Sequence, residues 1–212
     1  EAAQELKNAG VQVMTSGNHI WKKPGAAELL EEEPFLVRPA NYPPSVPGRG
    51  SVVWQSNLGV KVGILNLLGR VFMEPLDCPF RTGEAYIKRL RDEGVQVIVL
   101  DFHAEATSEK VAMGYHLDSR VSAVVGTHTH IQTADNLLLG DRTAYISDVG
   151  MTGPHDSVIG MRKDLVMDRF VHGLPHPFRV AKGDPRFQGV LIEIDRASGN
   201  ALSIERVDRP VG

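Results

Sequence analysis

The stretch VSAVVGTHTH, residues 121–130, decides the fold. Its first five residues predict a short buried strand, and the glycine that ends this strand is followed by two histidines in the sequence Thr-His-Thr-His. Residues 11–20, VQVMTSGNHI, repeat the arrangement with an asparagine and a histidine after the glycine. Open α/β folds place their ligands where strands end at the carboxyl edge of a sheet. Both stretches therefore predict an active site made by loops at that edge.

Along the rest of the chain, predicted strands alternate with predicted helices first, and predicted hairpins follow later. Helices are expected at residues 24–33, 82–93, 107–119 and 163–172, after an opening segment that reads as the tail of another helix. Strands are expected at residues 11–15, 51–55, 60–67, 95–101, 121–125, 134–139, 143–147, 187–195 and 201–207. This order predicts the α/β (α+β) class, with two packed mixed sheets flanked by helices in one domain, residues 1–212.

Composition narrows the class of protein. The chain has 212 residues, 42% of them apolar and 23% charged, as in an ordinary globular protein. A net charge of −3 argues against a broad nucleic-acid or membrane surface, although it leaves room for a local basic pocket. No apolar run reaches the ~18 residues that span a bilayer. We therefore expect neither a membrane partner nor a stable nucleic-acid partner, and homo-oligomerisation stays open.

The lone cysteine and the first residues add two expectations. Cys78 cannot form an intrachain disulfide, which fits a reducing cytoplasm. The chain opens with Glu1 rather than Met, partway into a helical pattern that Gly10 ends. We therefore expect the sequence to be N-terminally incomplete.

Imidazoles at three strand ends predict a metal site. His19, His103, His128 and His130 all follow predicted core strands, and Asn18 offers an amide oxygen beside them. One such histidine alone is more often an ordinary partly buried residue, but this set favours metal. Two ions ~3.5–4 Å apart clamp a phosphate and activate water near neutral pH, which suits phosphoester hydrolysis.

The order Gly-Asn-His, strand-end His and Gly-x-His-x-His resembles the calcineurin-like metallophosphoesterase superfamily, although Ile20 stands where an acidic residue is usual. Residues 66–73, 101–110 and 148–154 look like the YmdB-type branch. Members of that branch are bacterial phosphodiesterases that act on 2′,3′-cyclic nucleotides and other phosphodiesters. The resemblance covers essentially the whole chain and implies a four-layer sandwich.

The resemblance also implies roles for individual residues. Asn18, His103 and His128 would bind one ion, His130 the other, and His19 would be the general acid. The two divalent or trivalent ions would be iron or manganese, while the nitrogen and oxygen ligands would also accept zinc. The family's G-D aspartate and Glu-Asn pair do not occur ahead of Gly17. One or two βα units, roughly thirty to sixty residues, would be missing, so we expect weak or no activity from this chain alone.

The leading hypothesis is a di-metal phosphodiesterase that hydrolyses 2′,3′-cyclic nucleotides. In it, hydroxide bridging the ions attacks phosphorus while His19 protonates the leaving ribose oxygen. The alternatives are a phosphomonoesterase or nuclease on the same scaffold, and a metal- or nucleotide-binding regulator with little turnover.

Three further residues are weaker candidates. Arg70 would hold a phosphate or form a salt bridge, and Phe72 would stack on a base or pack in a loop. Asp148 would support a metal-bound histidine or cap the turn at Gly150. Glu105 and Glu109 are expected on or near the helix after His103, as first-turn acids.

Overall fold

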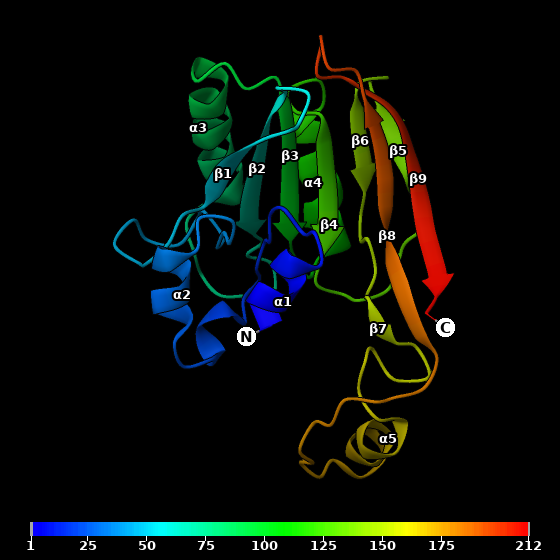
Figure 1. Ribbon diagram of the computed structural model, residues 1–212. Coiled ribbons are helices and arrows are strands. Elements are labelled where there is room, and N and C mark those ends of the chain that lie inside the picture. Colours follow the sequence, from blue (N-terminus) through cyan, green and yellow to red (C-terminus); the bar gives the residue numbers. More distant parts are fainter. Residues whose placement is uncertain (1, 212) are drawn as a thin grey trace.

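The computed structural model describes residues 2–211 and contains two sheets with helices around them (Figure 1). The helices are α1 (Ala2–Asn8), α2 (Ala26–Glu32), α3 (Pro79–Asp92), α4 (Thr107–Leu117), α5 (Lys163–His172) and the short 3₁₀ helix Ile20–Lys22. The strands are β1 (Ser51–Gln55), β2 (Lys61–Leu68), β3 (Val97–His103), β4 (Ala123–Thr127), β5 (Leu137–Leu139), β6 (Thr143–Ile146), β7 (Gly153–Pro154), β8 (Pro185–Ile194) and β9 (Ala201–Pro210).

The larger sheet has six strands in the order β1-β2-β3-β4-β6-β5. Its four central strands run parallel, and β1 and β5 close the two edges antiparallel. Parallel strands covered on both faces are apolar almost throughout, as the sequence of β3 predicted. In register, Leu68 lies opposite His103, which lies opposite Thr127. The carboxyl ends of β2, β3 and β4 therefore meet at one edge.

Side chains alternate along β3 and β4, so each face of the larger sheet has its own core. On one face Leu100 packs with Leu90 and Met113 of α3 and α4. On the other face Val99 packs with Ile204 of β9, from the smaller sheet. The layers therefore run helices, six-stranded sheet, three-stranded sheet.

The smaller sheet, β7-β8-β9, is antiparallel throughout, so the expectation of two mixed sheets is correct only for the larger one. A short hairpin joins β8 to β9, and such a connection can only make an antiparallel pair. Within residues 2–211 this sheet leaves Phe187, Leu191 and Leu202 at least half exposed, where a fourth layer of helices would cover them.

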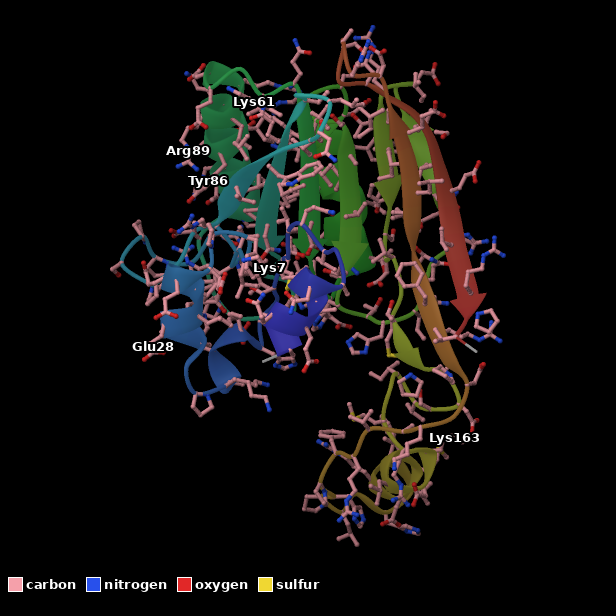
Figure 2. The ribbon with its side chains drawn as sticks, in the orientation of Figure 1. Lys7, Glu28, Lys61, Tyr86, Arg89 and Lys163 are labelled. Carbon is pink, nitrogen blue, oxygen red and sulfur yellow. The ribbon has the colours of Figure 1, made fainter. Side chains whose placement is uncertain are left out.

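Helix α3 shows why the helices lie where they do. Ile87 and Leu90 are buried against the sheet, and the half-buried Tyr86 packs beside them. Arg89 is exposed, with its guanidinium 4.5 Å from the Tyr86 ring centre (Figure 2). The helix begins at Pro79, not at Thr82 as expected. Proline suits the first helical position, and the amide of Thr82 already donates to the carbonyl of Cys78.

Most of the other predicted elements are confirmed, including both later hairpins and the helix at residues 163–172. Residues 11–15 form only one parallel bridge, Met14 with Leu36, instead of the expected strand. Helix α2 begins after Gly25, whose left-handed backbone (φ 80°) interrupts the helix expected from Pro24.

The segment 155–183, here called the α5 arm, projects beyond β7 and away from both sheets (Figure 1). It lies on the side of the molecule where the strands of the larger sheet end. Among residues 2–211 every helix is too short or too polar to cross a membrane.

Candidate metal centre

Three predicted ligands converge at the carboxyl edge of the larger sheet. The Nε2 atom of His103 lies 3.2 Å from the Oδ1 atom of Asn18 and 3.0 Å from the Nδ1 atom of His128. His103 ends β3, and His128 directly follows the neighbouring strand β4. Asn18 comes from a loop more than eighty positions away in the chain. Two strand ends and this loop thus bring together two imidazoles and an amide oxygen.

Gly17 permits the close approach of that loop. A Cβ atom at this position would lie 2.3 Å from the Nε2 atom of His103, far inside van der Waals contact. The glycine of the Gly-Asn-His motif therefore leaves room for the imidazole that the asparagine faces.

A buried carboxylate and a hydroxyl group orient His103. The Thr127 hydroxyl donates to the Oδ1 atom of Asp101 at 2.8 Å, so it accepts from the Nδ1 atom of His103 at 2.9 Å. Burial raises the pKa of Asp101 to about 6, against the hydrogen bonds from Thr15 and Thr127. Burial and then the nearby His128 lower the pKa of His103 to about 3. His103 is therefore neutral and presents an unprotonated Nε2 atom.

His128 presents its Nδ1 atom for a similar reason. Its Nε2 atom lies 3.0 Å from the Oε2 atom of Glu105, and a carboxylate can only accept a hydrogen bond. Burial lowers the pKa of His128, with Glu105 acting in the opposite direction. A neutral imidazole that donates from Nε2 keeps a lone pair on Nδ1. The lone pairs of His128, His103 and Asn18 then face one another without a proton between them.

This donor set fits a cation. Two ligand atoms at right angles around one ion, each about 2.1 Å from it, are about 3 Å apart, close to the observed separations. Such a site has few strong donors, however. Within residues 2–211 no group of three or more His, Cys, Asp or Glu side chains is placed to hold an ion. The amide of Asn18 is the third donor here.

The other two predicted residues lie at the margin of this group. His130 is exposed, and its Nδ1 atom lies 3.0 Å from the carbonyl of Ile159, which fixes Nε2 as the free nitrogen. His19 is also exposed, opens the 3₁₀ helix after Asn18, and adds to the lowering of the pKa of His103. Both lie close to the converging ligands without a hydrogen bond to them.

Asp148 holds the loop between the two histidines. It is 1% exposed, and its Oδ2 atom accepts from the amide of Thr129 at 2.9 Å and from the hydroxyl at 2.7 Å. Its Oδ1 atom accepts from the amide of Gly150, so it caps that turn. Of the two roles expected for Asp148, the cap of the turn at Gly150 is observed. Asp148 contacts no imidazole; it supports the loop through Thr129 instead. The support matters because His128 and His130 both have positive φ, 107° and 68°.

The loop after β2 presents Arg70 and Phe72. The amide of Gly69 donates to the carbonyl of His103, and the buried Glu109 carboxylate accepts from the amides of Arg70 and Val71. Within residues 2–211 no hydrogen bond or ion pair engages the Arg70 guanidinium, so the expected salt bridge is absent. Phe72 is 89% exposed, which excludes the expected packing role.

Several supporting residues act in ways that the sequence did not predict. Glu105 and Glu109 fit first-turn acids of a helix by pattern, but α4 begins at Thr107 and leaves Glu105 free to meet His128. Glu109 does lie in the first turn, yet it turns toward the loop after β2. Asp101 and Thr127 carry one usable signal, because each lies on a strand within two positions of a predicted ligand.

Comparison with known proteins gives consistent matches along the chain. The family model described as YmdB-like protein matches residues 1–207. The 2′,3′-cyclic-nucleotide 2′-phosphodiesterase of Bacillus subtilis is 46% identical over 202 residues, which cover 95% of this chain and 76% of that protein. A putative phosphatase/phosphodiesterase of Mycoplasma pneumoniae is 36% identical and covers 95% of this chain and 73% of its own length.

Solved structures give the same picture. A hypothetical protein from Thermus thermophilus superimposes with a TM-score of 0.91 at 39% identity, over 99% of this chain and 80% of that one. A structure described as a novel phosphatase, from Mycoplasma pneumoniae, gives 0.89 at 35% identity, over 98% and 75%. A 5′-nucleotidase precursor from Thermus thermophilus, with a TM-score of 0.57 at 17% identity over 99% and 40%, shares the fold alone.

Proposed function

Since this chain belongs to the YmdB-like family, we propose that it is a metal-dependent phosphodiesterase that opens 2′,3′-cyclic nucleotides. Water would add across one P–O bond of the cyclic diester and leave a nucleoside monophosphate. The name of the Bacillus subtilis relative supports the substrate class. The observation that carries the proposal is the convergence of three unprotonated donor atoms, from Asn18, His103 and His128.

These three residues would hold one ion, and His130 would contribute to a second. Iron or manganese would suit them, and zinc is compatible with the same ligands. Bound ions would supply positive charge to the phosphate and lower the pKa of the attacking water. Asp101, Thr127 and Glu105 would keep the imidazoles in the tautomers that bind a cation.

His19 would be the general acid. It is exposed beside Asn18, makes no hydrogen bond to the three ligands, and therefore has its ring free to give a proton to the leaving ribose oxygen. Arg70 and Phe72 would bind the substrate from the loop after β2. The guanidinium would pair with the phosphate and the exposed ring would stack on the base.

Two alternatives remain, each with its own support. The name phosphatase/phosphodiesterase of the Mycoplasma pneumoniae relative favours a phosphomonoesterase or nuclease. The small number of strong donors favours a metal- or nucleotide-binding regulator with little turnover. We place the protein in the bacterial cytoplasm, in keeping with the free thiol of Cys78 and the bacterial relatives.

Hydrolysis assays with matched variants test the proposal. The substrates are 2′,3′-cyclic AMP, bis-p-nitrophenyl phosphate and the monoester p-nitrophenyl phosphate, with added manganese or iron. We expect His103→Ala to lose both metal content and activity. We expect His19→Ala to keep its metal and to turn over about 10²–10⁴-fold more slowly, as for loss of a general acid. His116→Gln, on the far part of α4, is the control and should match the wild type.

Other outcomes decide between the alternatives. Full activity in the His103→Ala protein would refute the metal assignment. A clear preference for the monoester would establish the phosphomonoesterase instead. Stoichiometric metal without turnover of any of the three esters would establish the regulator.

A further inference from the structure

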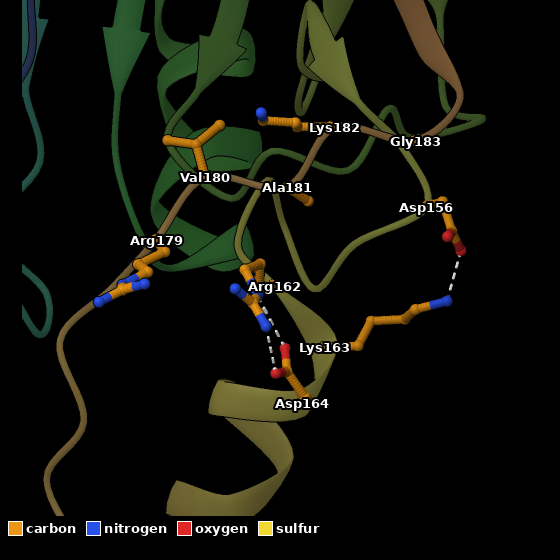
Figure 3. Close-up of a pocket in the computed structure, with 9 residues that line it drawn as sticks. All are labelled: Asp156, Arg162, Lys163, Asp164, Arg179, Val180, Ala181, Lys182 and Gly183. Carbon is orange, nitrogen blue, oxygen red and sulfur yellow. Dashed lines mark hydrogen bonds and ion pairs between the residues drawn. The ribbon is translucent and has the colours of Figure 1, made fainter.

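A basic pocket opens on the α5 arm, apart from the converging ligands (Figure 3). It has a volume of about 770 Å³, which is large enough for a nucleotide-sized ligand. Six of its lining residues are charged: Asp156, Arg162, Lys163, Asp164, Arg179 and Lys182. Nothing in the proposed reaction uses this pocket.

Two of its four cations lack an acidic partner. Asp156 pairs with Lys163, and Asp164 pairs with Arg162, as the dashed lines in Figure 3 show. Within residues 2–211 neither Arg179 nor Lys182 meets a carboxylate. Four cations less two carboxylates leave the lining at +2, although the whole chain carries −3. The charge of the lining therefore favours an anionic ligand.

Two exposed aromatic rings occur on the same arm as these cations, outside the residues that line the pocket. Phe178 directly precedes Arg179 and is 64% exposed, with the Arg169 guanidinium 5.1 Å from its ring centre. Phe170 on α5 is 80% exposed. Proteins that bind single-stranded nucleic acid combine two kinds of side chain. Cations pair with the phosphate backbone, and aromatic rings stack on the bases. A small inorganic anion would need only the cations.

The wall of the pocket is connected to the candidate metal centre. Val180 bridges to Met161, and the amide of Ala181 donates to the carbonyl of Gly160 at 2.9 Å. The next residue toward the N-terminus is Ile159, whose carbonyl accepts from His130. The pocket and a predicted metal ligand therefore share one short loop, on the side of the molecule where the strands of the larger sheet end (Figure 1).

We propose that this pocket is an accessory subsite for single-stranded RNA whose 3′ end carries the cyclic phosphate opened at the metal centre. Arg179 and Lys182 hold an upstream phosphodiester, and Phe178 stacks on a neighbouring base. The substrate class then includes RNA ends as well as mononucleotides. This inference rests on the proposed function for its catalytic part, while the RNA binding itself can be measured without turnover.

Binding is measured first, by fluorescence anisotropy of a labelled RNA with an ordinary 3′ hydroxyl, in EDTA. A length of about six nucleotides falls within the ~4–16 nucleotides that single-strand-binding folds cover. We expect the Arg179→Glu/Lys182→Glu protein to bind at least about tenfold more weakly. Its logarithmic salt dependence should become shallower by about 1–2, because two phosphate contacts are lost. Lys61→Glu/Lys88→Glu changes the net charge equally on another face and should bind like the wild type.

Turnover is measured second, as the ratio of kcat/KM for RNA ending in a 2′,3′-cyclic phosphate to kcat/KM for 2′,3′-cyclic AMP. We expect the Arg179→Glu/Lys182→Glu protein to lower this ratio about tenfold through KM. If the wild type hydrolyses neither substrate, the proposed function is refuted. The anisotropy measurement would still test whether the pocket binds RNA.

Four results of the binding and turnover measurements would overturn the subsite. They are undetectable RNA binding by the wild type, equal loss of binding in the control pair, an unchanged ratio in the pocket variant, and displacement of the RNA by equimolar inorganic phosphate. A change of oligomeric state in the pocket variant, seen by light scattering, would assign the surface to a second copy of the chain and would also overturn it.

Discussion

Thr127 places one hydroxyl group between the buried carboxylate of Asp101 and the imidazole of His103. We predict that Thr127→Val lowers metal affinity about 10–100-fold, because the tautomer of His103 is then no longer fixed. The buried Asp101 carboxylate would keep its hydrogen bonds from Thr15 and Asn66 but lose the one from Thr127, which should reduce the free energy of unfolding by about 1–3 kcal/mol. Calorimetric titration with Mn²⁺ and urea unfolding measure the two effects. Thr127→Ser keeps the hydroxyl and should restore both the metal affinity and the free energy of unfolding. Wild-type metal affinity in the Thr127→Val protein would contradict this role of the hydroxyl.

Gly17 gives a second prediction at the scale of single residues. Gly17→Ala should fold but lose metal affinity, because the new methyl group occupies space that His103 needs. A displacement of about 1 Å in a catalytic group can cost about 10²-fold in rate, so activity should fall by up to that factor. Gly189→Ala is the matched control, since its Cβ atom would make an ordinary contact at 3.6 Å. Equal loss in both proteins would point to general destabilisation.

Single residues also show what the sequence reveals about the site. The residues that converge can be found because each lies directly after a strand-like run and belongs to a recognisable motif. The role of Glu105 cannot, because it depends on His128, more than twenty positions away in the chain, and no local pattern relates the two. Glu109 is misleading because a first-turn acid is usually explained by the helix dipole, whereas this one binds amides of another loop.

Between elements, the ion pair of Lys110 and Asp148 joins α4 to the segment after β6. The two side chains are 2% and 1% exposed and their charged atoms lie 2.9 Å apart. Removing one partner of a buried pair leaves the other charge unpaired, so Lys110→Met should cost about 3–5 kcal/mol of unfolding free energy. Lys88→Met breaks an exposed pair with Asp92 and should cost less than about 1 kcal/mol. Chemical denaturation of both proteins decides, and equal costs would refute the structural role of the buried pair.

Elements were predictable where the pattern is local. The hairpins and α5 follow from apolar periodicity and turn residues, and the structure has them within a few residues of the expected bounds. The strand expected at residues 11–15 fails because a strand is defined by its partners, and this segment makes only one bridge. The start of α3 differs because Thr82 is a good cap by type, whereas Pro79 already fits the first helical position.

In the whole molecule, the two sheets and the helices α3 and α4 form the packed part, and the candidate ligands lie at one edge of it. The α5 arm is built differently. It carries six apolar side chains that are more than half exposed: Met167, Phe170, Val171, Leu174, Phe178 and Val180. We therefore expect an ion bound at this edge to be coupled to global stability, whereas the arm is not.

Thermal unfolding with and without metal tests that division. A metal that binds only the folded protein should add about 2.7 kcal/mol at one hundred times its Kd. For a chain of 212 residues each kcal/mol raises Tm by roughly 2–4 °C. We predict that Mn²⁺ raises the Tm of the wild type and of Arg179→Glu/Lys182→Glu equally, because the arm does not bind the ion. His103→Ala should lose the shift, since it removes the central donor of the three. An undiminished Tm shift in the His103→Ala protein would mean that the stabilising ion binds elsewhere. The predicted coupling between this edge of the sheet and the stability of the fold would then be wrong.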